Sequence, residues 1–211
     1  MVGSKAPSPV WLTPDEADRH CQAGASVWGF ASTDKGVDPD VVICGIGAEM
    51  MFEVIAAAAL LKKIAPELRV RVVNVTDLMV LGAVGTHPHA MTADDFNAIF
   101  TDDKAIHFNY HGTNFRETVA DWVLGYPHEL QGLLFHRPNL DRISIDGYME
   151  EGTTTTPFSM MLVNQTSRFH VAMAAVKGAK PNAKIQVKRQ ELLSTLDHAI
   201  KKANVTSCFK V

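Results

Sequence analysis

Cysteine is scarce in this sequence, and so are long apolar runs and any excess of one charge sign. The three cysteines among 211 residues are widely spaced and form no C-x-x-C pair, which argues against a disulfide framework or a thiolate metal site. The longest unbroken apolar run, residues 54–61, is far too short to span a bilayer, and the N-terminus has no signal-like apolar segment. The formal net charge of -3 suggests no basic surface for nucleic acid or an anionic membrane. We therefore expect a reduced, cytoplasmic, globular protein.

Residues 1–39 differ from the rest of the chain. Four prolines punctuate them, and no apolar period is sustained. Thr13 followed by Pro14 and two acidic residues predicts one helix, from Pro14 to about Ala23. We interpret this stretch as an interdomain arm or linker with one short helix. The remaining residues, 40–211, are long enough and apolar enough for one packed domain.

Predicted strands and helices alternate along residues 40–211. Short apolar or β-branched runs predict strands at residues 41–46, 70–75, 105–110 and 142–145. Apolar residues at helical spacing and capping residues predict helices at residues 49–63, 93–100, 128–135, 168–177 and 187–203. This alternation implies an α/β fold with a Rossmann-like, doubly wound, mostly parallel sheet.

A glycine pair follows the first strand of this domain. Gly45 and Gly47, with Asp77 after the next strand, imitate a dinucleotide-binding fingerprint. However, Met50 occupies the place of the third glycine, and Glu49 puts a negative charge where a pyrophosphate would lie. We interpret the glycines as a tight turn between strand and helix.

Two histidines flank a proline at His87-Pro88-His89. Their spacing resembles half of a metal site, but the sequence places no third ligand nearby. Because a zinc site needs three or four convergent ligands, we interpret this segment as a loop and expect no metal.

Two further places are candidates for binding. His111 comes at the carboxyl end of a predicted strand, where open parallel sheets place their ligands, and a ligand contact, a helix cap and an interdomain hydrogen bond all stay open for it. Thr153 and Thr154 belong to a run of four threonines after Gly152. Such a run can wrap an anion with backbone N–H groups, or its hydroxyls can stabilise a rigid interface loop. The acidic pair at residues 150–151 favours the loop.

Several runs resemble the last domain of the phosphoketolases that act on xylulose 5-phosphate and fructose 6-phosphate. These runs are VRVVNVTDLMVL (70–81), THPHAMTADDFNAIFT (86–101), HFNYHG (107–112), RISIDGYMEEGTTTTPFSM (142–160) and SRFHVAMAAV (167–176). The opening KAPSPVWL (5–12) is similar to the joint between that family's middle and final domains. The matching runs occur in the same order as in the family and cover nearly the whole chain. The resemblance therefore predicts that this chain is a phosphoketolase C-terminal domain.

The resemblance implies a parent enzyme built like transketolase. Its first two domains bind thiamine diphosphate and magnesium across a homodimer interface, and the enzyme cleaves a ketose phosphate with inorganic phosphate to acetyl phosphate and a shortened aldose phosphate. The cofactor supplies that chemistry. This chain carries neither the family's cofactor motif nor its histidine-rich catalytic segments. We therefore expect it to bind no cofactor, to be inactive alone, and to have the two missing domains as partners.

The resemblance also assigns one substrate contact. Lys5 matches a lysine of the family's joint that reaches the active site and helps hold the sugar phosphate, a role suited to a compact cation with three donors. The alternative hypothesis is a stand-alone regulatory module that binds a nucleotide or another metabolite near His111.

The chain departs from the family pattern twice. Asp146 stands where the family commonly has histidine. The segment Thr113–Gly125 intervenes between Gly112 and Tyr126, which are adjacent in the family, and is either an amphipathic insertion or an artefact of the gene model.

Overall fold

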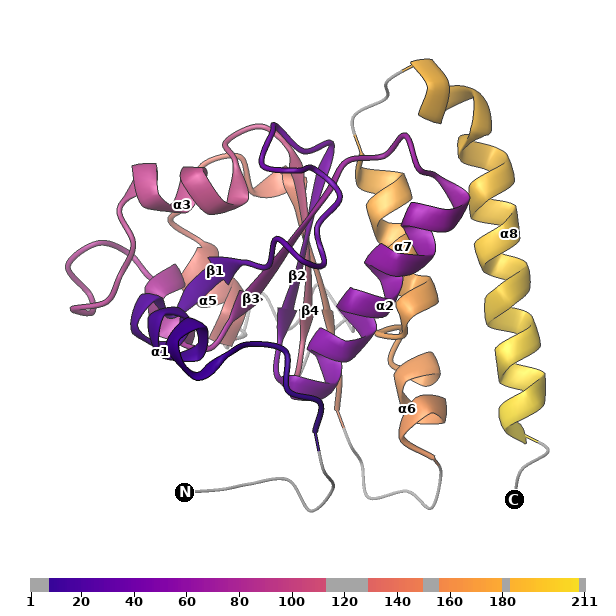
Figure 1. The fold of residues 1–211 in the computed structure, drawn as a ribbon, viewed down its shortest axis with the longest axis horizontal. Helices are drawn as coiled ribbons and strands as arrows, with labels where there is room; N and C mark the ends of the chain where they lie inside the picture. Colours follow the sequence, from indigo (N-terminus) through magenta and orange to yellow (C-terminus); the bar gives the residue numbers. More distant parts are fainter. Residues whose placement is uncertain (1–7, 113–128, 150–155, 180–182, 209–211) are drawn as a thin grey trace, which may run out of the picture.

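A computed structural model describes residues 8–112, 129–149, 156–179 and 183–208 of the chain (Figure 1). Its centre is a five-stranded sheet in the order β1-β3-β2-β4-β5. The strands are β1 (Ala25–Val27), β2 (Val41–Ile46), β3 (Val70–Val75), β4 (Ala105–Tyr110) and β5 (Ile143–Gly147). The last four run parallel, and β1 pairs antiparallel with β3. Every residue of β2 is buried, which is typical of a parallel strand with helices on both faces of its sheet.

Helices cover both faces of the sheet. They are α1 (Pro14–Ala23), α2 (Ala48–Ile64), α3 (Ala93–Phe100), α5 (Glu129–Leu134), α6 (Pro157–Val163), α7 (Arg168–Gly178) and α8 (Ala183–Cys208), with 3-10 turns η1 (Leu78–Leu81) and η2 (Leu140–Arg142). Figure 1 shows α2 and α7 on one side of the sheet, with α8 outside them, and α3 and α5 on the other. The predicted doubly wound, mostly parallel fold is confirmed.

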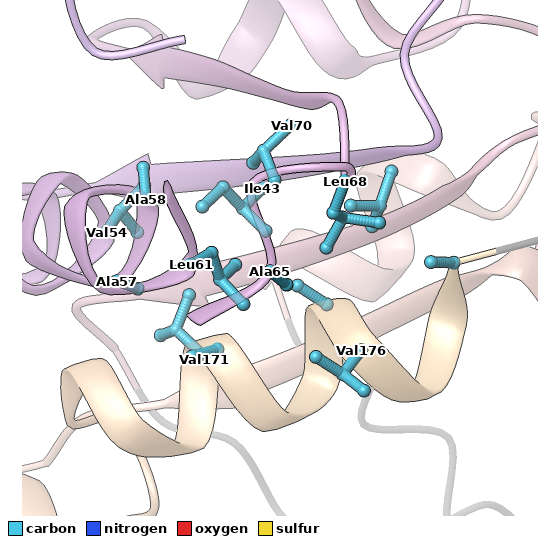
Figure 2. Close-up of a cluster of buried hydrophobic side chains, with 14 of the residues drawn as sticks. Ile43, Val54, Ala57, Ala58, Leu61, Ala65, Leu68, Val70, Val171 and Val176 are labelled. Atoms are coloured by element: carbon cyan, nitrogen blue, oxygen red, sulfur yellow. The ribbon is translucent and has the colours of Figure 1, made fainter. Parts of the chain in front are cut away.

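Alternation along each central strand divides the core in two. One cluster joins the sheet to α2, α7 and α8, and Figure 2 shows Leu61 of α2 between Val171 of α7 and Ile43 of β2. The second cluster lies on the opposite face, where Phe96 and Phe100 of α3 stack at 4.6 Å between ring centroids. Cys44 of β2 belongs to this second cluster, and its burial raises the pKa of its thiol.

The N-terminal arm contains more structure than the sequence predicted. The helix from Pro14 to Ala23 is confirmed, and Thr13 caps it reciprocally with Glu16. We did not expect β1, which is only three residues long and too short for a detectable apolar period. Residues 25–33 run along the free edge of β3, so part of the predicted arm belongs to the sheet. The domain boundary at residue 39 stays a prediction.

Hydroxyl side chains in this segment replace strand hydrogen bonds. Ser32 Oγ accepts from the N–H of Val72 at 2.9 Å, and Thr33 Oγ1 accepts from the N–H of Val70 at 2.8 Å. The N–H groups of Trp28 and Thr33 in turn donate to the carbonyls of Val72 and Val70. The edge of β3 is therefore paired beyond the end of β1.

A buried carboxylate joins α2 to α7. Glu53, 3% exposed, accepts from the backbone N–H of Arg168 at 2.6 Å and from its guanidinium at 2.6 and 3.0 Å. The side chain of Ser167, the N-cap of α7, makes no capping hydrogen bond. Glu53, which belongs to the neighbouring helix α2, instead accepts from the Arg168 N–H in the first turn of α7, where backbone N–H groups have no partner within the helix. The same contact raises the pKa of Arg168.

Glu53→Ala should destabilise the fold by about 2–4 kcal/mol, because it leaves the Arg168 N–H and a half-buried guanidinium without their acceptor. The matched control is Asp197→Ala, which breaks the exposed pair of Asp197 with Lys201 (2.7 Å). That control should cost less than about 0.5 kcal/mol. Urea unfolding of the wild-type chain and of the two variants measures the loss of stability in each variant. Equal losses for the two variants would contradict the role given to Glu53.

Candidate functional site at the carboxyl edge of the sheet

Three parallel strands end together at one edge of the sheet. Ile46 of β2 is in register with Val75 of β3 and with Tyr110 of β4. The residues that follow, including Gly47 and His111, are therefore brought to the same edge, where parallel α/β sheets bind their ligands.

His111 lies at this edge, as the sequence predicted. Its backbone N–H donates to the Ile46 carbonyl at 2.8 Å, and its Nδ1 lies 3.3 Å from Oε2 of Glu49 in the first turn of α2. Its ring meets Tyr148 edge-on, at 5.2 Å between centroids. The imidazole is thus oriented by two neighbours, Glu49 and Tyr148, while 41% of the side chain stays exposed, which leaves room for a contact with another domain or a ligand.

The two glycines beside His111 serve close packing. A Cβ on Gly45 would lie 2.9 Å from the backbone Cα of Met51, so only glycine lets α2 approach β2 this closely. Gly47 has a φ of 97°, and a Cβ there would lie 2.5 Å from Cβ of His111. His111 and Glu49 thus occupy the turn where a dinucleotide's pyrophosphate would approach. The structure agrees with the interpretation of these glycines as a tight turn.

Two buried amides flank Gly45 in the neighbouring strands, Asn74 of β3 and Asn109 of β4, and no sequence pattern pointed to them. The Asn74 amide donates to the Gly45 carbonyl at 3.1 Å, which turns its Oδ1 toward Nε2 of His20 at 2.6 Å. Nε2 therefore carries the proton, and Nδ1 of His20 accepts from the Ser26 hydroxyl at 2.6 Å. Because His20 belongs to α1, this network attaches α1 to the sheet.

The unusual Asp146 has a partner in the next strand. Its Oδ2 lies 3.7 Å from Nε2 of His107, whose Nδ1 lies 3.0 Å from the Ser144 hydroxyl. His107 is 2% exposed and therefore belongs to the buried interior. These three residues line a cleft of about 590 Å³ beside α7, with His170 and Lys177. The carboxylate therefore adds an anionic group to the lining of this cleft.

A carboxylate also lies beside the two histidines of the His-Pro-His segment. We expected no third ligand there, but Asp77 lies two residues after the end of β3, and its Oδ2 lies 3.0 Å from Nδ1 of His89. One ligand atom each from Asp77, His87 and His89 fit within 4.8 Å of one another. The hydrogen bond from His89 lowers the pKa of the Asp77 carboxyl. Twelve residues separate Asp77 from His89, so spacing alone did not indicate this contact.

The other predicted site residues lie outside the described part of the chain. These are Lys5, Thr153, Thr154 and the segment Thr113–Gly125. Among the described residues, no helix is long and apolar enough to cross a membrane.

Comparison with known proteins decides the family. Residues 5–208 match the family described as the XFP C-terminal domain. This chain belongs to that family. It is 52% identical over 187 residues to a protein of Schizosaccharomyces pombe (strain 972) named "Probable phosphoketolase", covering 89% of this chain and 21% of that protein.

Bacterial relatives carry the same name. The one from Brucella abortus (strain 2308) is 41% identical over 177 residues, covering 84% of this chain and 21% of the relative. The one from Bradyrhizobium diazoefficiens is 39% identical over 203 residues, covering 94% of this chain and 24% of the relative. The resemblance to phosphoketolases is confirmed, and this chain spans about a fifth of the length of the relatives it matches.

Gly47→Ala should cost about 1–3 kcal/mol more than Gly85→Ala, because a methyl group forced into a filled space distorts its neighbours. Both glycines have positive φ (97° and 86°), but only Gly47 has atoms within 4 Å of the added carbon. Because both glycines have a positive φ, the difference between the two variants reports the contact with His111 together with any difference in strain that arises from ψ. Chemical unfolding gives the two stabilities, and equal losses would mean that this contact is not tight.

Proposed function

We propose that this chain is the C-terminal domain of a thiamine-diphosphate-dependent phosphoketolase, which converts a ketose phosphate and phosphate to acetyl phosphate and an aldose phosphate. In this proposal the domain shapes the substrate site and contacts the other domains, but does not catalyse the reaction alone. The observation that carries it is the family match over residues 5–208 in a chain that spans about a fifth of relatives named phosphoketolase.

The carboxyl edge of this domain does not fit the diphosphate of the cofactor. Glu49 presents a carboxylate at the start of α2, and His111 packs against Gly47 in the same turn. A diphosphate at this helix end would meet repulsion and a filled space. This supports a cofactor site, with its magnesium, in the two domains that precede this one in the parent enzyme.

The residues of this chain would act by binding and positioning. Lys5 would hold the phosphate of the sugar as a point charge with three donors. Thr153 and Thr154 would order an interface loop or contact an anion through backbone N–H groups. His111, held by Glu49 and Tyr148 with much of its surface exposed, is suited to a hydrogen bond with another domain. The full-length protein would be a homodimer, and the expected compartment is the cytoplasm.

The isolated chain should form no acetyl phosphate, whereas a chimera should. The chimera replaces the last fifth of the Schizosaccharomyces pombe relative with this chain, which is 52% identical to the replaced region. Hydroxamate detection of acetyl phosphate, with a ketose phosphate, phosphate, thiamine diphosphate and magnesium, measures activity, and the unmodified relative is the positive control. A folded but inactive chimera would contradict the proposal. Tight binding of an adenine nucleotide or acyl-CoA by the isolated chain would instead favour the stand-alone module.

Lys5→Ala in that chimera should lower kcat/KM by roughly tenfold or more, the effect of losing one charged hydrogen bond worth about 1.5–3 kcal/mol. Lys62→Ala, at an exposed position on α2, is the matched control and should leave kcat/KM unchanged. Unchanged kinetics in both variants would show that Lys5 is not a substrate ligand.

A further inference from the structure

Asp77, His87 and His89 form a cluster with the chemistry of a metal site. They offer one carboxylate oxygen and two imidazole nitrogens within 4.8 Å of one another, at the end of β3 and in the loop that follows η1. We propose that these three residues bind one Zn²⁺ ion. The proposal does not depend on the phosphoketolase function proposed above.

The spacing of the ligand atoms suits a tetrahedral ion. With bonds of about 2.0–2.1 Å to nitrogen and oxygen, two ligands of a tetrahedral zinc lie roughly 3.3 Å apart. Oδ2 of Asp77 and Nδ1 of His89 are 3.0 Å apart, close to one edge of that tetrahedron. The rings of His87 and His89 meet edge-on at 5.1 Å between centroids, and all three ligand atoms lie within 4.8 Å of one another, so the set has to contract to reach the spacing of a tetrahedral site.

Asp77 is fixed in position before any ion arrives. Its backbone N–H donates to the Gly24 carbonyl at 3.0 Å, at the end of α1. Its Oδ1 accepts from the N–H of Met79 at 2.9 Å and thereby caps η1. The second oxygen, Oδ2, is the one that contacts His89. One carboxylate oxygen thus holds the backbone while the other is available as a ligand.

The loop that carries the histidines is anchored at both ends. Nη2 of Arg137, a residue 5% exposed, lies 3.3 Å from the Leu81 carbonyl, 3.1 Å from the Gly82 carbonyl and 3.3 Å from the Met91 carbonyl. Within the loop, the N–H of Ala90 donates to the His87 carbonyl at 3.1 Å. Pro88 further restricts the backbone between the two imidazoles. Anchoring lowers the entropy lost when the ligands converge on an ion.

The donor set suits zinc. Two imidazoles and one carboxylate are ligands that zinc accepts, and three protein ligands leave a fourth position for water or for a group from another domain. His89 is 64% exposed and Asp77 29%, so an ion reaches the site from solvent. The ion would replace the hydrogen bond between these two side chains, and the proton on Nδ1 of His89 would be released or transferred to Nε2.

Isothermal titration of the 211-residue chain with Zn²⁺ tests the proposal. We expect one equivalent to bind with a dissociation constant in the micromolar range or below. His87→Ala, His89→Ala and Asp77→Asn should each weaken binding at least tenfold. Asp77→Asn keeps an oxygen that can accept from Met79, so it removes the anionic ligand while preserving the cap on η1. Circular dichroism melts confirm that each variant is folded.

His198→Ala is the matched control, since His198 is an exposed histidine on α8 outside the cluster. It should leave the affinity unchanged. Substitution with Co²⁺ adds a second measurement, because intense visible absorption indicates a four-coordinate site. Absence of stoichiometric Zn²⁺ binding, full affinity in the three cluster variants, or an equal loss in His198→Ala would each overturn the proposal.

Discussion

The bond between Glu53 and Arg168 determines how the helical layer lies on the sheet. Arg168 begins α7, so the contact fixes where that helix starts relative to α2. From there α7 presents Val171, Ala172, Ala175 and Val176 to the sheet as a continuous buried stripe. A carboxylate that caps a neighbouring helix also places its own charge favourably in the dipole field of that helix. Apolar burial stabilises the layer, while this polar contact sets its register.

The carboxyl edge of the sheet shows how packing decides which ligands are acceptable. Gly45 brings α2 against β2, and Gly47 brings His111 against the start of α2. The same glycines that open a phosphate site in dinucleotide-binding folds here make room for protein atoms. The resulting edge is lined by an imidazole and a carboxylate in contact, at 3.3 Å. Such an edge is suited to hydrogen bonding with another polypeptide surface rather than to an anionic cofactor.

Local patterns allowed the sequence to predict the parallel strands. Residues 41–46 are a short apolar run, residues 70–75 are rich in valine, and residues 105–110 carry apolar and aromatic side chains. The helix at Pro14 was equally clear from its capping residues. The three residues of β1 are too few to carry a periodic signal. Their partners in β3 also lie nearly fifty residues further along the chain, so no local pattern indicates the pairing. The pairings of Asp77 with His89 and of His20 with Asn74 also depend on the fold. Side chains that converge only through tertiary structure leave no spacing to detect.

Edge protection explains why the N-terminal arm cannot be separated from the domain at will. Composition suggests a domain boundary at residue 39. However, Ser32, Thr33 and Trp28 form hydrogen bonds with the backbone of β3 along its outer side. A fragment trimmed at that point would present the outer side of the six-residue strand β3 with unpaired N–H and C=O groups. Exposed edges of this kind pair with strands of other molecules, which is a route to aggregation. The arm thus covers the edge of β3. Because its own strand, β1, is only three residues long and its hydroxyl side chains replace backbone hydrogen bonds, it offers few free backbone groups with which a strand of a second molecule could pair.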